Sequence, residues 1–224
     1  MKRHSLATRV WHWVNAIALV VLFMSGLNIS NAHPRLYWGD WGFDASHAWL
    51  EVARFPGWAT IPDYYSLAMA RQWHLLFAWI FALGLLLFML ASLANRHFRR
   101  DIASKRKEWR WGAIRADIAA HLRFDFSHRE GKYNFLQKLA YTIVLFILLP
   151  TMILTGMAIS PGLNASMPFL LDLFGGRQSA RSIHFLAAWG LFGFFVVHVA
   201  LVLLSNPLRQ MRDMITGGPA DAAA

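Results

Sequence analysis

Four long stretches of the chain are almost entirely apolar, and polar segments separate them. The stretches cover residues 11–29, 73–93, 139–159 and 183–204. Each is 19 to 22 residues long with few or no charges, and a helix of that length spans the hydrocarbon core of a bilayer. The pattern predicts an all-α integral membrane protein, a four-transmembrane-helix bundle. We expect residues 1–215 to form one membrane domain and residues 216–224 to form a tail.

The composition narrows the class of protein. Hydrophobic residues make up 57% of the chain, which is too apolar for an ordinary soluble domain. Cysteine is absent, so disulfides, cysteine-ligated iron–sulfur clusters and the covalent attachment of c-type haem are excluded. The formal net charge of +10 does not indicate nucleic acid. The basic residues cluster beside the apolar stretches, where they fix the orientation of a protein among membrane lipids.

The polar segments differ in charge, and the difference predicts the topology. Segment 31–66 carries two basic residues against four acids, whereas segment 96–133 carries eleven against five. Short positive segments stay on the cytoplasmic side of the membrane. We therefore expect segment 96–133 and both termini in the cytoplasm, with segments 31–66 and 160–182 outside.

The first and third stretches carry further local signals. A basic start before an apolar stretch also fits a cleaved signal peptide. The length of the first stretch and its Trp11-His12-Trp13 opening favour a retained helix instead. Pro150 lies in the middle of the third stretch, where it is expected to kink the helix. No internal repeat is apparent along the chain.

Four histidines lie inside the apolar stretches, and an ionisable side chain there is a functional candidate by default. His184 and His198 are 14 residues apart, which on a helix is about 21 Å and nearly four whole turns, so both rings leave one face. The topology places His74 and His184 near the outer ends of their helices. It places His12 and His198 near the inner ends. The depths therefore pair His74 with His184, and His12 with His198.

Two imidazoles from two helices suit the two axial positions of a six-coordinate b-type haem. A zinc, copper or di-iron site needs ligands that converge within a few ångströms, whereas these pairs are far apart, and no Glu-x-x-His motif is present. The alternative is that the histidines are ordinary core residues. We predict two non-covalent haems b, the outer on His74 and His184, the inner on His12 and His198. The other histidines are expected to be solvated surface residues: His4, His33, His47, His97, His121 and His128.

Three arginines precede these histidines by three residues. Arg71 and Arg181 do so at the outer rim, and Arg9 does so at the inner rim. Guanidinium groups there suit haem propionates, although snorkelling of the side chain to the interface gives the same pattern. Gly190 and Gly193 lie between the two histidines of the last stretch and leave room for a flat ring, or simply for close helix packing.

The motifs Arg-Val-Trp-His12-Trp-Val-Asn, Arg-Gln-Trp-His74 and His184-x13-His198 resemble the bacterial dihaem cytochrome b561-like family. More closely they resemble its branch of cytochrome b subunits of hydrogenases, formate dehydrogenases and thiosulfate reductases. The resemblance runs from residue 4 to about residue 215 and implies a four-helix bundle with two haems b in the bacterial inner membrane. It also implies exchange of electrons with a membrane quinone, which would bind beside the inner haem, near His12, Asn15 and His198.

The resemblance further implies a redox partner outside the membrane. We expect an electron-transfer subunit that links the quinone pool to a periplasmic partner, for example a molybdopterin oxidoreductase or a cytochrome c. The alternatives are a stand-alone oxidase of superoxide or another small oxidant, and a haem-free scaffold or transporter. The aromatic residues of segment 31–66 suit either an interfacial belt on the lipid or a contact surface for a protein. Its four acids would attract a basic partner but not an anionic lipid surface, so we expect the segment to be a docking surface. Its aromatic residues are Tyr37, Trp38, Trp41, Trp49, Phe55, Trp58, Tyr64 and Tyr65.

Overall fold

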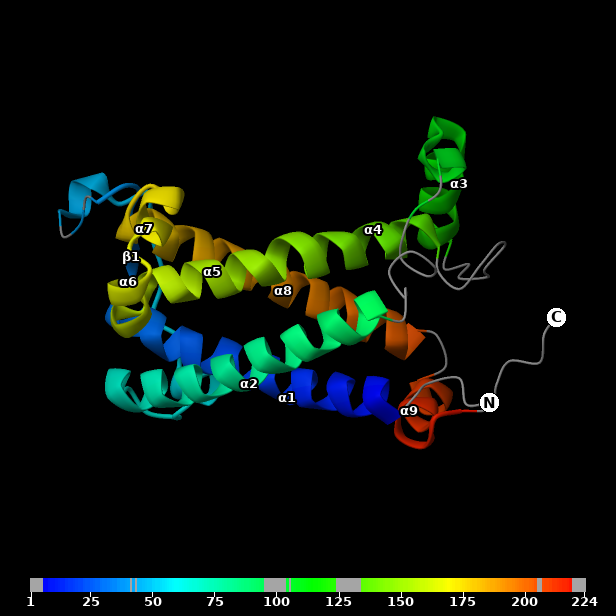
Figure 1. Cartoon of the computed structure of the whole chain (residues 1–224), viewed down its shortest axis with the longest axis horizontal. Coiled ribbons are helices and arrows are strands. Elements are labelled where there is room, and N and C mark those ends of the chain that lie inside the picture. Colours follow the sequence, from blue (N-terminus) through cyan, green and yellow to red (C-terminus); the bar gives the residue numbers. More distant parts are fainter. Residues whose placement is uncertain are drawn as a thin grey trace. The chain divides into compact units, whose positions relative to one another are not determined.

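A computed structural model of the chain describes residues 6–40, 42, 44–94, 104, 106–123, 134–204 and 207–218 (Figure 1). Four of its helical segments are long and apolar enough to cross a membrane. They are α1 (Leu6–Ala32), α2 (Leu67–Ala94), the third span Phe135–Ile159 and α8 (Arg177–Leu204). All four begin four to six residues before the predicted stretches. Helices continue through the polar interface, whereas hydropathy marks only the hydrocarbon part.

The chain divides into two compact units. The first comprises the residues up to Leu85 and those from Thr151 onward, and the second comprises Leu86–Pro150. All four candidate histidine ligands belong to the first unit.

The third span is irregular. It consists of α4 (Phe135–Ile143), the π-helical segment η5 (Val144–Leu148) and α5 (Leu149–Ile159). Pro150 lacks an N–H, and its ring crowds the carbonyl four residues earlier. The wider π-helical segment ends two residues before Pro150, and π-helical turns and prolines are both recognised sources of helix irregularity. The structure thus shows a π-helical segment before Pro150, and the kink expected there stays a prediction.

Segment 31–66 is folded against the helices of the first unit. It contains a two-residue antiparallel ladder, β1 (Arg35–Leu36) with β2 (Leu50–Glu51), and the short 3-10 helices η1 (Ala45–His47) and η2 (Gly57–Ala59). Asn28 of α1 is fully buried and donates to the carbonyl oxygens of Pro62 and Tyr64, both at 2.9 Å. The side-chain amide of Asn28, near the end of α1, thus holds the last part of segment 31–66 against the helix.

The same segment is also attached to α8. Ser182 is fully buried, and its hydroxyl donates to the Tyr37 carbonyl at 2.6 Å while accepting from the indole N–H of Trp49 at 3.0 Å. Ser182 lies two residues before His184. The outer segment is therefore packed onto the turn of α8 that carries a candidate ligand.

Segment 160–182 is helical rather than open. It contains α6 (Pro161–Ser166), α7 (Phe169–Phe174) and the first turn of α8. Gly176 has a φ of 103°, and a Cβ there would lie 2.5 Å from a carboxylate oxygen of Asp40. Only glycine fits this approach. Segments 31–66 and 160–182 therefore approach each other closely at Asp40 and Gly176 inside the first unit.

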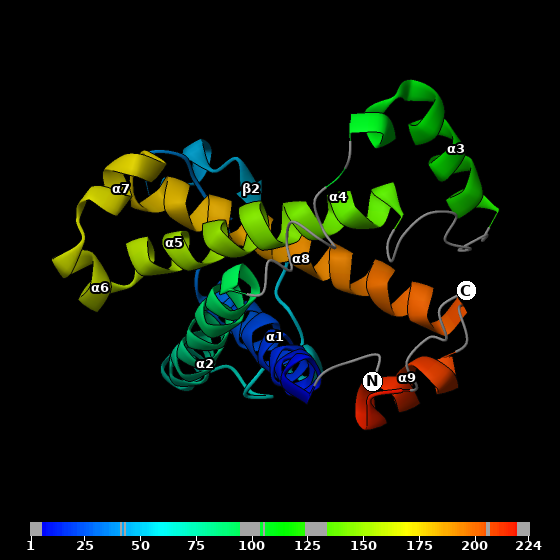
Figure 2. The same cartoon turned by 45° about the vertical axis from the view of Figure 1, so that its right-hand side comes forward.

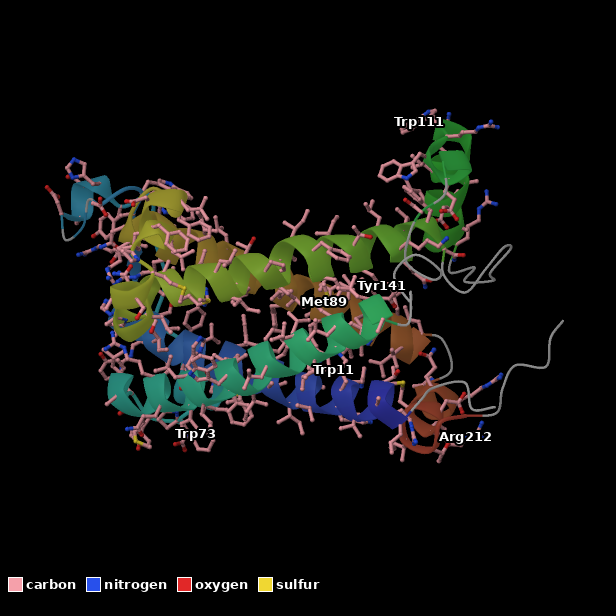
Figure 3. The ribbon with its side chains drawn as sticks, in the orientation of Figure 1. Trp11, Trp73, Met89, Trp111, Tyr141 and Arg212 are labelled. Atoms are coloured by element: carbon pink, nitrogen blue, oxygen red, sulfur yellow. The ribbon has the colours of Figure 1, made fainter. Side chains whose placement is uncertain are left out.

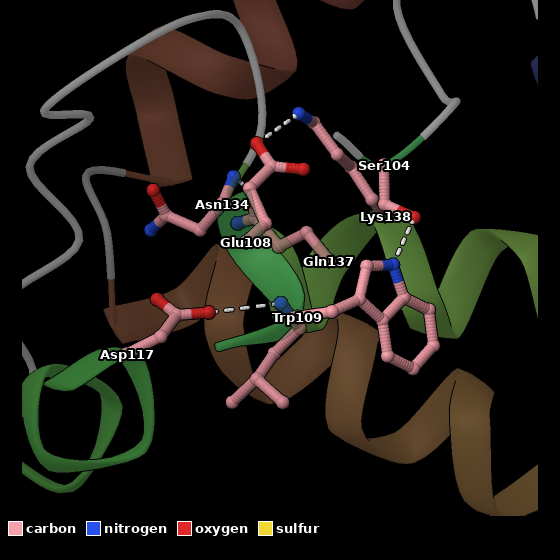
Figure 4. A network of polar contacts seen from close by, with 8 residues as sticks. Ser104, Glu108, Trp109, Asp117, Asn134, Gln137 and Lys138 are labelled. Carbon is pink, nitrogen blue, oxygen red and sulfur yellow. Dashed lines mark hydrogen bonds and ion pairs between the residues drawn. The ribbon is translucent and has the colours of Figure 1, made fainter. Parts of the chain in front are cut away.

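The second unit contains helix α3 (Trp111–Leu122) and the 3-10 helix η4 (Arg106–Trp109), both inside the predicted basic segment. Figure 4 shows how they join α4. The mostly buried ammonium of Lys138 pairs with Glu108 at 2.7 Å, and Asp117 accepts from the backbone N–H of Leu136 at 2.8 Å. Specific polar contacts thus join η4 and α3 to the start of the third span.

A short helix, α9 (Pro207–Thr216), follows α8 and was not expected from the sequence. Figures 1 and 2 both place it beside the start of α1. Arg9 donates to the carbonyl of Ile215, and the indole N–H of Trp13 donates to the carbonyl of Met214 at 3.3 Å. The last described residues are thus fixed to the turn of α1 that contains His12.

Candidate functional site

The structure brings the rings of His74 of α2 and His184 of α8 close together in an edge-on arrangement. Their ring centroids are 6.2 Å apart, and the ring planes are inclined by 61°. Both side chains are partly buried. The sequence places these residues at the same depth on two helices, and the structure turns their rings toward one another.

His12 of α1 and His198 of α8 form a second pair. Their centroids are 6.4 Å apart at 57°. The ring of His198 stacks on Phe194, with centroids 6.1 Å apart, and the ring of His12 meets Trp13 edge to face at 5.2 Å. Aromatic neighbours therefore fix both imidazoles of this pair.

The two separations identify what fits between the rings. If a metal ion lies between two imidazoles, the distance between the ring centroids has two parts. It is the sum of two metal–nitrogen bonds of roughly 2 Å each and of the distance from each coordinating nitrogen to the centroid of its own ring, about 6 Å in all. Each pair is therefore spaced for one metal ion between its rings. Among the described residues, no group of three or more His, Cys, Asp or Glu side chains could hold a metal. A metal that brings its own equatorial ligands, as the iron of haem does, fits such a two-imidazole site.

Hydroxyl groups at the outer pair are functional candidates that the sequence analysis missed. Ser25 Oγ lies 3.0 Å from His74 Nδ1, and Thr155 Oγ1 lies 2.9 Å from His184 Nδ1. Both hydroxyl residues are fully buried.

The end of the first unit that contains His74 and His184 gathers positive charge. Burial, followed by the charges of Arg181 and Arg71, holds the pKa of His33 below its usual range. His33 is half-buried, so the expectation that it is a solvated surface residue is wrong. His47 is exposed as expected, whereas His4, His97 and His128 and the side chain of His121 lie outside the described part. Among the described residues, the guanidinium groups of Arg71 and Arg181 have no carboxylate partner. Two such cations close together suit an anionic group.

The inner end differs. One guanidinium nitrogen of Arg9 donates a hydrogen bond to the Ile215 carbonyl of α9. The buried Nε of the same side chain has no hydrogen-bond partner among the described residues. The side-chain oxygen of Asn15, one turn beyond His12, is also buried without a partner in that part of the chain. Gly193 of α8 is exposed, and a Cβ there would meet nothing within 4 Å. Packing among the described residues therefore does not require that glycine.

Comparison with known proteins now identifies the family. The family model for prokaryotic cytochrome b561 matches residues 3–217. The chain belongs to the prokaryotic cytochrome b561 family. It is 30% identical to the "Putative protein-methionine-sulfoxide reductase subunit YedZ1" of Azospira oryzae, over 93% of each chain. It is 28% identical to the "Probable Ni/Fe-hydrogenase B-type cytochrome subunit" of Cupriavidus necator, over 85% of this chain and 74% of the relative. No solved structure matches.

Membership confirms the expected class of protein. The chain is a membrane-bound b-type cytochrome that transfers electrons, and the cofactor of that class is haem b. The four membrane-spanning segments make it a multi-pass protein of the bacterial inner membrane. The predicted family, fold class and location are confirmed.

Proposed function

We propose that the chain binds two haems b, one between the rings of each histidine pair. It carries electrons between the quinone pool and a periplasmic redox partner. The observation that carries the proposal is the presence of two separate imidazole pairs, with centroids 6.2 Å and 6.4 Å apart. His184 and His198 place them on one face of α8, about 21 Å apart along the helix axis. When bound, the haem iron supplies a one-electron couple near each side of the membrane.

The residues around each pair fit a haem. At the outer site Arg71, Arg181 and the nearby His33 form a cluster of nitrogen groups suited to propionates. At the inner site the buried Nε of Arg9 is a donor for the same purpose. Only the histidines are proposed to contact iron, and the arginines act as charge partners.

Aromatic side chains occupy the level between the two pairs. Phe23 of α1 stacks on Phe192 of α8 with centroids 4.4 Å apart and nearly parallel rings. Trp189 contacts both of these rings, at 5.4 Å and 5.6 Å. This packing excludes water between the sites and keeps both in a region of low dielectric constant.

The inner pair is the proposed site of quinone exchange. The buried oxygen of Asn15 has no partner among the described residues, and it can accept a hydrogen bond from a quinol hydroxyl. An unpaired buried polar atom costs about 1–3 kcal/mol, so a ligand that satisfies it gains affinity. Asn15 lies one turn from His12, which places such a ligand beside the inner haem.

The outer segment is the proposed surface for the partner. Trp38 and Trp49 stack at 5.5 Å and remain half-exposed, and Trp58 is 83% exposed. The acids of this segment are exposed and would attract a basic partner. Tyr37 is buried and serves the fold instead. Since relatives are named as subunits of a methionine-sulfoxide reductase and of hydrogenases, we expect a periplasmic oxidoreductase subunit, such as a molybdopterin oxidoreductase, or a cytochrome c.

The haem proposal is tested by counting haem in the purified protein and in two single variants. The wild type should yield two haems b per chain in a pyridine haemochrome assay. His184→Ala should lose the outer haem only, and His198→Ala the inner haem only. Two unaltered six-coordinate spectra in either variant would contradict the ligand assignment, and absence of haem from the wild type would favour a scaffold or transporter. Consumption of superoxide with reduction of added quinone to quinol, in the absence of any partner, would favour the stand-alone oxidase.

A further inference from the structure

The structure exposes an internal repeat that the sequence analysis overlooked. Residues 70–79 and 180–189 share the pattern Ala-Arg-x-x-His-x-Leu-x-Ala-Trp, and these contain His74 and His184. Residues 25–30 read Ser-Gly-x-x-Ile-Ser, and residues 155–160 read Thr-Gly-x-x-Ile-Ser. The expectation that the chain has no repeat is therefore wrong. Two pairs of spans, α1 with α2 and the third span with α8, carry the same two motifs.

Each repeat places its hydroxyl against its own histidine. Ser25 Oγ lies 3.0 Å from Nδ1 of His74, and Thr155 Oγ1 lies 2.9 Å from Nδ1 of His184. The sequence separations differ, because the outer segment enlarges the first repeat. The contact nevertheless recurs with almost the same length, so it belongs to the repeated unit rather than to one accidental packing.

A second contact fixes the direction of each hydrogen bond. Ser25 Oγ lies 2.6 Å from the carbonyl oxygen of Val21 and 3.1 Å from that of Leu22. Thr155 Oγ1 lies 2.6 Å from the carbonyl oxygen of Thr151 and 3.3 Å from that of Met152, so the shorter contact in each case is to the residue four positions earlier. A carbonyl oxygen only accepts, and a hydroxyl has one proton, so that proton goes to the carbonyl four residues earlier. The hydroxyl oxygen must then accept from the ring. Each imidazole therefore carries its proton on Nδ1 and keeps the lone pair of Nε2 for a metal.

We infer that Ser25 and Thr155 are positioning residues for the outer haem, an inference that rests on the proposed haem site. Accepting the Nδ1 proton holds the ring in one tautomer and makes Nε2 a more basic ligand. A more basic ligand stabilises ferric over ferrous iron. The two hydroxyls therefore lower the midpoint potential of the outer haem, and each contributes through a different axial ligand.

The inner pair provides a reference within the same molecule. When residues 25–30 are aligned with residues 155–160, His12 corresponds to Thr142. When residues 70–79 are aligned with residues 180–189, His198 corresponds to Phe88. The inner ligands are thus not copies of one another. Within the described part of the chain, the ring of His198 has aromatic contacts but no hydrogen bond to a hydroxyl. Removing a hydroxyl at the outer pair should therefore leave the inner potential unchanged.

The test uses the full-length protein with both haems bound. Ser25→Ala and Thr155→Val remove the hydroxyls with little change of shape. Ser25→Thr and Thr155→Ser are matched controls, since each installs the hydroxyl residue that the other repeat uses. The readouts are a spectroscopic redox titration and the electron paramagnetic resonance spectrum of the ferric haems, with the outer haem identified by its loss in His184→Ala.

We expect Ser25→Ala and Thr155→Val each to shift the outer ferric–ferrous equilibrium about ten-fold toward ferrous iron. For a one-electron couple that is a rise of about 59 mV in potential. The double variant should shift further, and both controls should match the wild type. Unchanged outer potentials and spectra in both hydroxyl-free variants would overturn the inference while leaving the haem proposal intact.

Loss of the outer haem is also informative. If Ser25→Ala loses it and Ser25→Thr retains it, the hydroxyl itself holds the ligand in place and the inference stands. Equal loss in both variants would overturn it, because packing rather than hydrogen bonding would then be responsible. A wild-type protein without haem would refute the proposed function itself.

Discussion

Replacement of Gly84 tests how closely α1 and α2 must approach for the inner site to form. A Cβ at Gly84 would lie 2.3 Å from Cζ3 and 3.1 Å from Cε3 of Trp11. Trp11 lies beside α2, where its ring is 6.5 Å from that of Phe81, and it directly precedes His12 (Figure 3). Carbon atoms in ordinary contact are about 3.5 Å apart, so Gly84→Ala requires a relative displacement of about 1 Å.

That displacement is large for a metal ligand. Metal–ligand distances hold to about 0.2 Å, and overpacking of this kind costs about 1–3 kcal/mol of stability. We expect Gly84→Ala to lower the thermal stability in detergent and to reduce occupancy of the inner haem. The outer haem, held by residues more than two turns away along α2, should be retained. A pyridine haemochrome assay together with an optical melting curve measures both effects.

Two further variants make the result specific. Gly112→Ala in α3 is the matched control, because a Cβ there would meet nothing within 4 Å, and alanine favours a helix by about 0.5–1 kcal/mol. Trp11→Leu combined with Gly84→Ala should recover stability, with a coupling of about 0.5–3 kcal/mol, as expected for residues in contact. If Gly84→Ala keeps both haems and the wild-type melting temperature, close packing on Trp11 is not what positions His12.

Other regions yield three shorter predictions. Lys138→Met removes the cation that pairs with the partly buried Glu108 and should destabilise the protein by about 1–3 kcal/mol in thermal unfolding; adding Glu108→Leu should restore part of the loss. Because the pKa of His33 is lowered in the folded state, the unfolded chain binds its proton more readily. Stability should fall as the pH drops below the usual histidine pKa, and melting curves of His33→Gln should show a weaker dependence. Reporter fusions after Asp63 should report the outside and those after Lys107 the inside; the reverse would exchange the inner and outer labels.

Hydropathy predicted the spans, and the position of each histidine along its helix predicted which histidines lie together, because both depend on the sequence of one helix at a time. The beginnings of the helices were placed several residues late, because the N-terminal parts of α2 and α8 include polar residues such as Arg71 and Arg181. The attachment of the outer segment could not be predicted. Its contacts run from Asn28 and Ser182 to backbone carbonyls, and a sequence does not show where a carbonyl will lie.

The hydroxyls at the outer pair could have been found from the sequence. Ser25 and Thr155 each stand one residue before a glycine, and the same residues follow at the same distances. The signal was missed because the two copies are similar rather than identical and because a segment of different length follows each. Comparing the chain with itself around each histidine, rather than along its whole length, would have revealed it.

The outer site combines two features that act on the potential in opposite directions. The hydroxyls make the ligands more basic and lower the potential. The positive charges of Arg71 and Arg181 stabilise the ferrous state, which carries one positive charge less, and raise the potential. Replacing an arginine should therefore have the opposite effect to replacing a hydroxyl: Arg181→Gln should lower the outer potential, whereas Thr155→Val should raise it. Redox titration of the two variants and of their combination separates these contributions. If both variants moved the potential in the same direction, the arginines would not act through their charge.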